Sequence, residues 1–365
     1  MKRLTVVLAA VLATAALAPL SAHAKTPPDF YGVVNQGEIY PYDAWVEGLA
    51  GVETMRTQFD WRRIQPGPGR CQASANLGIC NWTYYDYFVG IHAYFGIRIF
   101  PYILNVPSWV APDPETPPIR SKKDKAAWTD FVQALVARYG PGGQYWKRYF
   151  RKQFSGGKPR PITHWEIWNE PSDGSYWEPQ PDPEEYAKLL EITGRAIHKA
   201  HKRADVVFAG LFGTPTEDND GIKAFNFYRR AFARKGLGKH FDDVGVHPYG
   251  PILKRLNVQM DWVLEEMKAA GFAGRDIWVT ELAWSSSEPP TILGVGPEGQ
   301  ARMLKRGFRL FEKMQKQWNI AGVHWYAWQD LDPNIVICEF CEKAGLLTFD
   351  RQAKPSLQAF LDIAG

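Results

Sequence analysis

Residues Thr163–Pro171 read T-H-W-E-I-W-N-E-P, and a second stretch, D-I-W-V-T-E-L-A-W-S, spans Asp276–Ser285. Each begins with the apolar and aromatic residues typical of a buried strand, and each reaches a glutamate, Glu170 or Glu281. The proline that closes the first stretch cannot extend a strand ladder. Glu170 and its neighbour Asn169 are therefore predicted at the carboxyl end of a strand, which is where a (β/α)8 barrel carries its chemistry.

The rest of the chain repeats this alternation of strand and helix. Strands are predicted at residues 30–35, 52–59, 97–104, 163–170, 206–211, 243–247, 277–281 and 322–328. Helices are predicted at 42–49, 84–95, 124–139 (with an acidic cap at Asp124), 182–203, 221–235, 254–270, 297–318 and 356–363. Such alternation indicates parallel βαβ units, and no Gly-rich dinucleotide turn follows any strand. We predict an α/β protein, a single (β/α)8 TIM barrel with elaborated loops on its catalytic face.

The first 24 residues have the pattern of a secretory signal peptide. Lys2 and Arg3 precede an apolar run that ends at Ala22-His23-Ala24, a small-x-small cleavage site. We expect residues 1–24 to be removed and residues 25–365 to form the barrel domain. No other stretch approaches the ~18 apolar residues of a membrane span, so the protein is expected to be secreted, extracellular or periplasmic, without a membrane contact.

The charges exclude one class of partner. The 365 residues have a net charge of +4, and the basic residues are scattered through the predicted helices. A nucleic-acid partner is therefore not expected. Nothing in the composition requires a cofactor, and we expect a monomer.

Four cysteines are present: Cys71, Cys80, Cys338 and Cys341. An even count in an exported chain predicts two disulfides. Three connectivities are possible, and we favour the local pairs 71–80 and 338–341. The second pair alone is also the spacing of a zinc or redox site, but no matching Cys or His pair lies nearby.

Strand alternation indicates which side chains share a face with the two glutamates. These sets are His164, Glu166, Trp168 and Glu170; Thr54, Arg56 and Gln58; Gly245, His247 and Tyr249; Ile277, Val279 and Glu281; and His324, Tyr326 and Trp328. If these faces point into the barrel, Arg56 lies beside several carboxylates and keeps one of them ionised. The alternative is an interior ion pair between Arg56 and Glu166 that has no part in catalysis.

Two carboxyl groups at one rim match the requirement of glycosidic bond cleavage, in which one protonates the leaving oxygen and the other meets the developing positive charge. Glu281, near Arg56 and Tyr249, is predicted to be the ionised nucleophile. Glu170, near aromatic walls, is predicted to be the acid/base. Asn169 is expected to donate to a sugar hydroxyl. His247 is expected to orient Glu170 or bind substrate, unless it is only a packed core residue.

At these residues the chain resembles a known group of enzymes. W-E-I-W-N-E-P (Trp165–Pro171), V-T-E-L-A-W (Val279–Trp284) and H-P-Y (His247–Tyr249) are similar to motifs of the clan A retaining glycoside hydrolases, above all family 39 and its bacterial relatives. The resemblance implies that Glu170 is the acid/base and Glu281 the nucleophile, with Tyr249 supporting the nucleophile. It also implies functional positions for Arg56 on the second strand and Trp328 on the eighth.

The substrate expected from this resemblance is a polysaccharide or oligosaccharide. Tryptophans on or near the predicted loops are expected to stack on sugar rings along an extended groove, with the alternative that several of them are only core residues. They are Trp61, Trp82, Trp109, Trp177, Trp284 and Trp325. A groove favours endo-acting hydrolysis. The alternatives are an exo-acting β-glycosidase similar to the β-xylosidases, although no C-terminal β-sandwich is evident, and a carbohydrate-binding barrel without catalysis.

A metal-dependent hydrolase is a further alternative, with His164, His247 and His324 as ligands beside carboxylates. The sequence contains no His-x-His or H-E-x-x-H pairing that would support it. We therefore predict no metal in the site.

Overall fold

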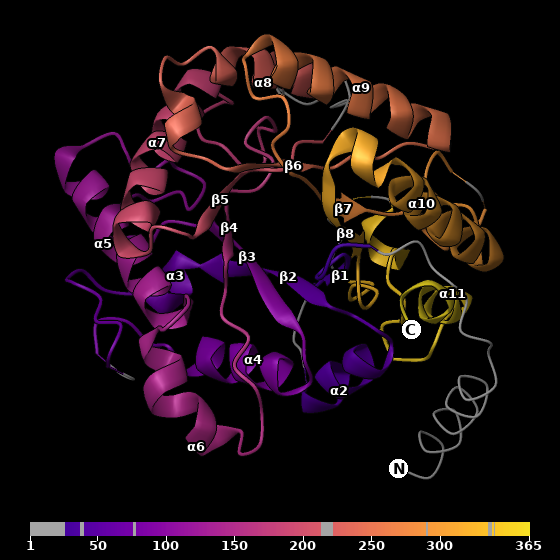
Figure 1. Ribbon diagram of the computed structural model, residues 1–365, viewed down its shortest axis with the longest axis horizontal. Coiled ribbons are helices and arrows are strands. Elements are labelled where there is room, and N and C mark those ends of the chain that lie inside the picture. The colour runs from indigo at the N-terminus through magenta and orange to yellow at the C-terminus, as the bar shows by residue number, and fades with distance from the viewer. Residues whose placement is uncertain are drawn as a thin grey trace.

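The computed structural model describes residues 26–36, 40–75, 78–212, 222–289, 291–334, 338 and 340–365. The predicted signal peptide, residues 1–24, lies outside the described residues. Eight parallel strands form a closed barrel in which each strand pairs with the next and β8 pairs with β1. Figure 1 shows this ring of strands surrounded by helices. The (β/α)8 barrel predicted from the sequence is confirmed.

The strands lie within a few residues of their predicted positions. Their bounds are β1 Tyr31–Val34, β2 Thr54–Asp60, β3 Arg98–Leu104, β4 His164–Ile167, β5 Asp205–Phe208, β6 Asp243–Val246, β7 Ile277–Leu282 and β8 Ile320–Tyr326. The largest differences are at the carboxyl ends of β4 and β5, which stop three residues early. These early ends matter because the chain leaves regular pairing where the candidate site begins.

The main helices also match the predicted pattern. They are α2 Pro41–Leu49, α4 Thr83–Tyr94, α5 Lys122–Tyr139, α7 Pro183–Ala200, α8 Ala224–Phe232, α9 Leu253–Ala269, α10 Pro297–Trp318 and α11 Pro355–Ala364. Short turns add α3 Trp61–Ile64, η1 Trp146–Phe150, α6 Arg151–Gln153, η2 Leu237–Lys239 and η3 Cys341–Lys343. No described helix combines the length and apolar character needed to cross a bilayer.

Helix α5 begins earlier than predicted, and a different residue caps it. The Ser121 side chain accepts a hydrogen bond from the Asp124 backbone N–H at 3.1 Å. A serine hydroxyl at this position satisfies one of the unpaired N–H groups of the first turn. Asp124 is therefore the third helical residue, not the cap, and its carboxylate accepts from the Ser121 hydroxyl.

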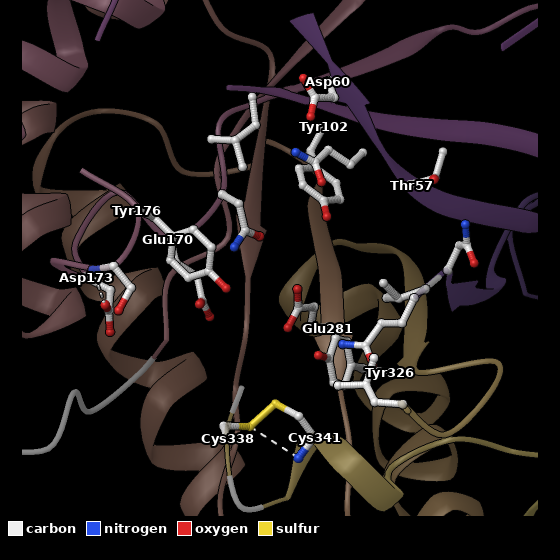
Figure 2. A pocket seen from close by; sticks show the side chains of 18 of the residues that line it. Thr57, Asp60, Tyr102, Glu170, Asp173, Tyr176, Glu281, Tyr326, Cys338 and Cys341 are labelled. Carbon is white, nitrogen blue, oxygen red and sulfur yellow. Dashed lines mark hydrogen bonds between the residues drawn. A yellow bond between two sulfur atoms is a disulfide. The ribbon is translucent and has the colours of Figure 1, made fainter. Parts of the chain in front are cut away.

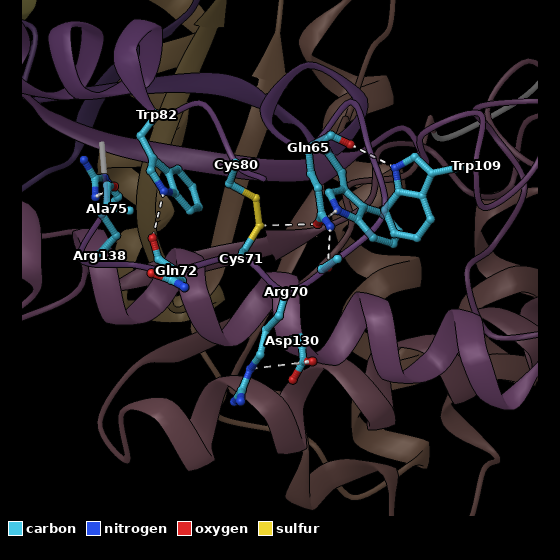
Figure 3. Close-up of a disulfide and its surroundings, with 12 residues drawn as sticks. Gln65, Arg70, Cys71, Gln72, Ala75, Cys80, Trp82, Trp109, Asp130 and Arg138 are labelled. Carbon is cyan, nitrogen blue, oxygen red and sulfur yellow. Dashed lines mark hydrogen bonds and ion pairs between the residues drawn. A yellow bond between two sulfur atoms is a disulfide. The ribbon is translucent and has the colours of Figure 1, made fainter. Parts of the chain in front are cut away.

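Both predicted disulfides form in the structure: Cys71–Cys80 and Cys338–Cys341. The first closes a loop between α3 and α4 (Figure 3), and the buried Arg138 of α5 donates to the carbonyl oxygens of Ala73 and Ala75 in the same loop. Arg138 is itself paired with Asp86. The disulfide thus closes the loop on itself, and the buried cation of Arg138 ties it to α5.

Candidate active site

A cavity of about 620 Å³ opens at the carboxyl ends of the strands. Its volume lies in the ~300–1,000 Å³ range of ligand pockets. The predicted residues on its wall are Asn169, Glu170, Tyr249 and Glu281. Figure 2 shows Glu170, which follows β4, and Glu281, on β7, facing the same space, with Tyr102, Tyr176 and Tyr326 around them.

Arg56 organises the floor of this site. It is fully buried on β2, and its guanidinium donates to three side chains: to Glu166 at 2.6 Å, to Glu281 at 2.7 Å and to Asn169 at 2.8 Å. The guanidinium also lies 4.2 Å from the centre of the Tyr102 ring. The guanidinium is planar and its N–H groups point in fixed directions, so it holds Glu166, Glu281 and Asn169 in one relative geometry.

The predicted alternative of an Arg56–Glu166 ion pair is therefore also present. Glu166 is fully buried, and its second oxygen accepts the Gly210 backbone N–H at 2.9 Å. Because Glu166 is absent from the cavity wall, its role in the described structure is to hold Arg56. The same arginine reaches Glu281, so the ion pair and the candidate site form one network.

Glu281 has a partner for each carboxylate oxygen. Arg56 donates to Oε1, and the Tyr249 hydroxyl donates to Oε2 at 2.6 Å. Glu281 thus accepts from one cation and one hydroxyl, and the two hydrogen bonds fix the orientation of its carboxyl group. Gln259 in turn donates to the Tyr249 carbonyl oxygen at 2.5 Å and fixes the loop that carries the tyrosine.

Glu170 lies in the opposite electrostatic environment. Burial raises the pKa of Glu170 to about 8, and the negative charge of Asp173 contributes to the rise. His247 Nδ1 lies 2.7 Å from Glu170 Oε1. Burial lowers the pKa of His247 to about 4, so the imidazole is neutral at neutral pH and supplies no positive charge to ionise Glu170.

The His247 tautomer follows from its surroundings. Nε2 has no hydrogen-bond partner among the described residues. A buried acceptor without a partner is tolerated better than a buried N–H without one. The proton therefore belongs on Nδ1, which donates to Glu170 Oε1 and leaves the second carboxyl oxygen to carry the acidic proton.

The two carboxyl groups are close together. One oxygen of Glu170, one of Glu281 and one His247 nitrogen all lie within 4.8 Å of one another. Inverting glycosidases separate their carboxyl groups by ~6.5–9.5 Å, and retaining ones by ~5–5.5 Å. The pair is thus in the range of direct attack on a sugar carbon.

These three residues are also the one group within the described ranges that could hold a metal ion by spacing. However, Arg56 and Tyr249 already donate to the two oxygens of Glu281, and His247 Nδ1 already contacts Glu170. A buried arginine 2.7 Å from Glu281 opposes a second cation. The alternative metal set of His164, His247 and His324 is not brought together among the described residues. His164 lies at the start of β4, beside Asp205 and Asp243.

The backbone turns sharply where β4 ends. Trp168 and Glu170 have φ values of 77° and 40°, in the left-handed region that non-glycine residues rarely adopt. Strained positions of this kind cost ~1–3 kcal/mol each and gather at functional sites. The turn moves Trp168 into the core, where its indole N–H donates to the Tyr176 carbonyl oxygen at 2.5 Å, and leaves Glu170 facing the cavity.

The prediction that tryptophans line the site is wrong. Trp177, Trp284 and Trp328 are buried, and none of them is on the cavity wall. Trp177 packs edge-on against Trp168, with ring centroids 5.5 Å apart, and Trp109 donates to the Gln65 carbonyl oxygen. The other tryptophans predicted to stack on sugars are also core residues: Trp61, Trp82 and Trp325. Their large apolar surface is used between strands and helices.

Aromatic residues of another type take their place. Tyr84, Tyr102, Tyr176 and Tyr326 lie on the cavity wall, with two phenylalanines. Tyr326 shares the predicted inward face of β8, so alternation could have identified it. β8 ends at Tyr326, and Trp328 lies beyond the regular strand, where alternation no longer holds.

Comparisons of the whole fold place this barrel beside known enzymes. The sequence matches no family model, and it has no significant match among curated proteins. A family 39 glycoside hydrolase from the gut symbiont Bacteroides cellulosilyticus WH2 superposes with a TM-score of 0.61 at 20% identity, over 93% of this chain and 64% of that one. A monomeric β-xylosidase from Caulobacter crescentus CB15 gives 0.60 at 18% identity, over 93% and 69%.

A family 10 structure from Paenibacillus barcinonensis is similar over nearly its whole length, with a TM-score of 0.59 at 16% identity and coverage of 92% and 95%. This chain therefore spans about two thirds of the family 39 chains and nearly all of the family 10 chain. At these identities the likeness is one of fold. The chain has the (β/α)8 fold of the family 39 glycoside hydrolases and of their family 10 and family 5 counterparts.

Proposed function

We propose that this protein is a retaining β-glycoside hydrolase, with Glu281 as nucleophile and Glu170 as acid/base. The observation that carries the proposal is a pair of carboxyl groups with oxygens within 4.8 Å and opposite environments. Glu281 accepts from an arginine and a tyrosine hydroxyl. Glu170 has a pKa raised to about 8, so it holds a proton at neutral pH.

The reaction follows from the proton on Glu170 and from the orientation of Glu281. A Glu281 oxygen attacks the anomeric carbon while Glu170 gives its proton to the departing oxygen, which leaves as an alcohol. This first step gives a covalent intermediate, an ester between the sugar and Glu281. Glu170, now a carboxylate, takes a proton from water as that water attacks the same carbon, so the ester breaks and the original configuration returns.

The neighbouring groups support this sequence. Asn169 Oδ1 accepts from Arg56, which turns its amide N–H groups toward the cavity, where they can donate to a sugar hydroxyl. The Tyr249 hydroxyl and Arg56 hold Glu281 in one orientation for attack. His247 holds Glu170 through Nδ1 and takes no charge of its own near neutral pH.

We infer that the enzyme is secreted and that its substrate is a polysaccharide. The shape of the cavity favours endo-acting hydrolysis. In the ring order, Glu170 follows β4 and Glu281 ends β7. Wall residues come from both arcs between them: Thr57 and Tyr84 on the arc that contains β2, and Phe212 and Tyr249, which follow β5 and β6, on the other. A cavity that extends on both sides of the cleaved bond admits a chain, whereas exo-action, the alternative, needs one closed end.

The test is hydrolysis of a panel of plant and bacterial polysaccharides by the wild type and by Glu281→Gln, with product sizes measured by chromatography. The wild type is expected to release oligosaccharides of mixed length. The variant keeps the shape of the site but loses the nucleophile, and its turnover is expected to fall at least ~10³-fold. Near-normal turnover by Glu281→Gln would overturn the assignment, and release of single sugars alone would favour exo-action.

A further inference from the structure

One exposed cation lies on the wall of the cavity. Arg63 belongs to the short helix α3 directly after β2, and with Asp60 and Tyr84 it lines the β2 side of the cavity. Its guanidinium lies 3.7 Å from the centre of the Tyr84 ring. A flat cation held on an aromatic face keeps its N–H groups at the edges, in a fixed plane.

The Arg63 guanidinium makes no ion pair with its acidic neighbour Asp60 in the described part of the chain. Asp60 Oδ1 accepts the Arg63 backbone N–H at 3.0 Å, and Oδ2 accepts from Asn105 at 3.1 Å. The ion pair of Asp60 is with Arg62, at 3.6 Å. Within the described ranges, the Arg63 side chain makes no ion pair, so its donors are available to a ligand.

The rest of the wall has the opposite character. Among the described residues that line the cavity, Arg63 is the one Lys or Arg; Asp60 lies near it on the β2 side, and Asp173, Glu170 and Glu281 form the acidic part at β4 and β7. Between them, the β2 side contributes the neutral polar side chains of Thr57 and Gln58. An anionic group on a bound chain is attracted to Arg63 and repelled by the acidic part, which places that chain in one register.

We propose that Arg63 binds an anionic substituent, a uronic acid carboxylate or a sulfate ester, on a sugar at the β2 side of the cavity. The planar guanidinium matches either group with two parallel hydrogen bonds. The substrate is then an acidic polysaccharide. This inference rests on the proposed glycosidase function but concerns a residue outside the reacting pair.

Binding to the inactive Glu281→Gln protein tests the inference without turnover. The probes are a glucuronate-bearing oligosaccharide, the same compound with the carboxylate reduced to an alcohol, and a sulfate ester of the reduced compound. Each is titrated by calorimetry against four proteins: the Glu281→Gln background alone, with Arg63→Gln, with Arg63→Lys, and with Arg62→Gln. Arg62 is the matched control because it is adjacent, equally charged and absent from the cavity wall.

Arg63→Gln is expected to weaken binding of a charged probe roughly tenfold, with no change for the reduced probe. Arg62→Gln should leave both unchanged, and Arg63→Lys should give an intermediate loss. The preference for the charged probe should also shrink between 50 mM and 500 mM NaCl. If Arg63→Gln weakens the binding of the sulfated probe alone, the anionic substituent is a sulfate ester.

The inference is overturned if no charged probe gains affinity from Arg63, or if Arg63→Gln and Arg62→Gln have the same effect. It is also overturned if wild-type enzyme hydrolyses a neutral polysaccharide best and Arg63→Gln does not alter that rate. If the neutral polysaccharide is the best substrate, the protein is still a glycosidase, and only the inference about Arg63 fails. Failure of Glu281→Gln to abolish turnover would instead contradict the proposed function.

Discussion

Two glutamates of the same type differ here because their neighbours differ. Glu281 accepts from Arg56 and Tyr249, while Glu170 faces a neutral His247 and the negative charge of Asp173. The sequence could predict the pairing of Arg56 with Glu281 because both lie on inward strand faces, whereas Tyr249 lies beyond the end of β6 and was indicated by the resemblance of its H-P-Y motif. It could not predict Asp173, because this residue follows the sharp turn after β4, where no periodicity holds.

The raised pKa of Glu170 predicts the alkaline limb of the pH profile. Glu170 must be protonated to act as acid, so kcat/KM should be maintained below its pKa and fall as the pH rises through about 8. Asp173→Asn removes a negative charge that raises this pKa, so the limb should move to lower pH. The measurement is kcat/KM from pH 5 to 10 for both proteins.

The matched control for the alkaline limb is Glu170→Gln with an aryl glycoside whose leaving group needs no proton. Its first step should survive and show no limb near pH 8, because glutamine does not titrate. An identical limb in Glu170→Gln, or a limb that Asp173→Asn leaves in place, would assign the titration to another group.

At the level of the elements, the prediction was accurate for strand and helix positions and weak at their ends. The pattern for α10 gave both ends correctly, since Pro297 starts the helix and Asn319, in the left-handed conformation, ends it. By contrast, Trp168 and Trp328 were assigned to inward faces by alternation. Both lie beyond the last paired residue of their strands, so the period of two no longer determines where they point.

The opposite end of the barrel contains an acidic network with its own pH dependence. Asp243 begins β6, and its Oδ2 accepts from the Trp278 indole N–H at 3.2 Å. Burial, with Asp205, Asp276 and Asp242 nearby, raises the pKa of Asp243 to about 8. His164, 3.6 Å away, has its pKa lowered to about 4 by burial, so it is neutral and does not compensate the charge.

This network predicts that stability falls with rising pH. A carboxyl group whose pKa is raised in the folded state contributes most to the free energy of unfolding below its unfolded pKa of ~3.9. This contribution is lost as the pH rises through about 8. Asp243→Asn should match the wild type at pH 5 and exceed its free energy of unfolding at pH 9 by about 1–3 kcal/mol. Urea unfolding at the two pH values measures this difference.

The adjacent Asp242 is the control for that measurement. It accepts from the Val206 backbone N–H at 2.9 Å and contacts His198 at 3.0 Å, and its pKa is lowered, so its charged form is stabilising. Asp242→Asn should therefore lose stability at pH 9. Equal effects of Asp243→Asn at pH 5 and pH 9 would contradict the assignment.

For the whole molecule, strand–helix alternation was enough to predict a closed barrel and to bring residues 56, 169, 170, 247, 249 and 281 to one rim. What it could not predict is the surface of the cavity. Tyr176 reaches the wall from the loop after β4, and Tyr84 and Arg63 reach it from helices after β2 whose placement depends on tertiary packing. Most of the tryptophans expected on the wall are core residues instead. Substrate preference therefore depends on features that strand periodicity does not determine.

The stereochemistry of hydrolysis tests the central claim most directly, namely that Glu170 and Glu281 act as a close pair by double displacement. The anomer first released from a β-linked substrate is observed by ¹H NMR before mutarotation. Carboxyl oxygens within 4.8 Å predict the β-anomer, because two displacements restore the configuration. Initial release of the α-anomer would show a single displacement by water and would contradict the account.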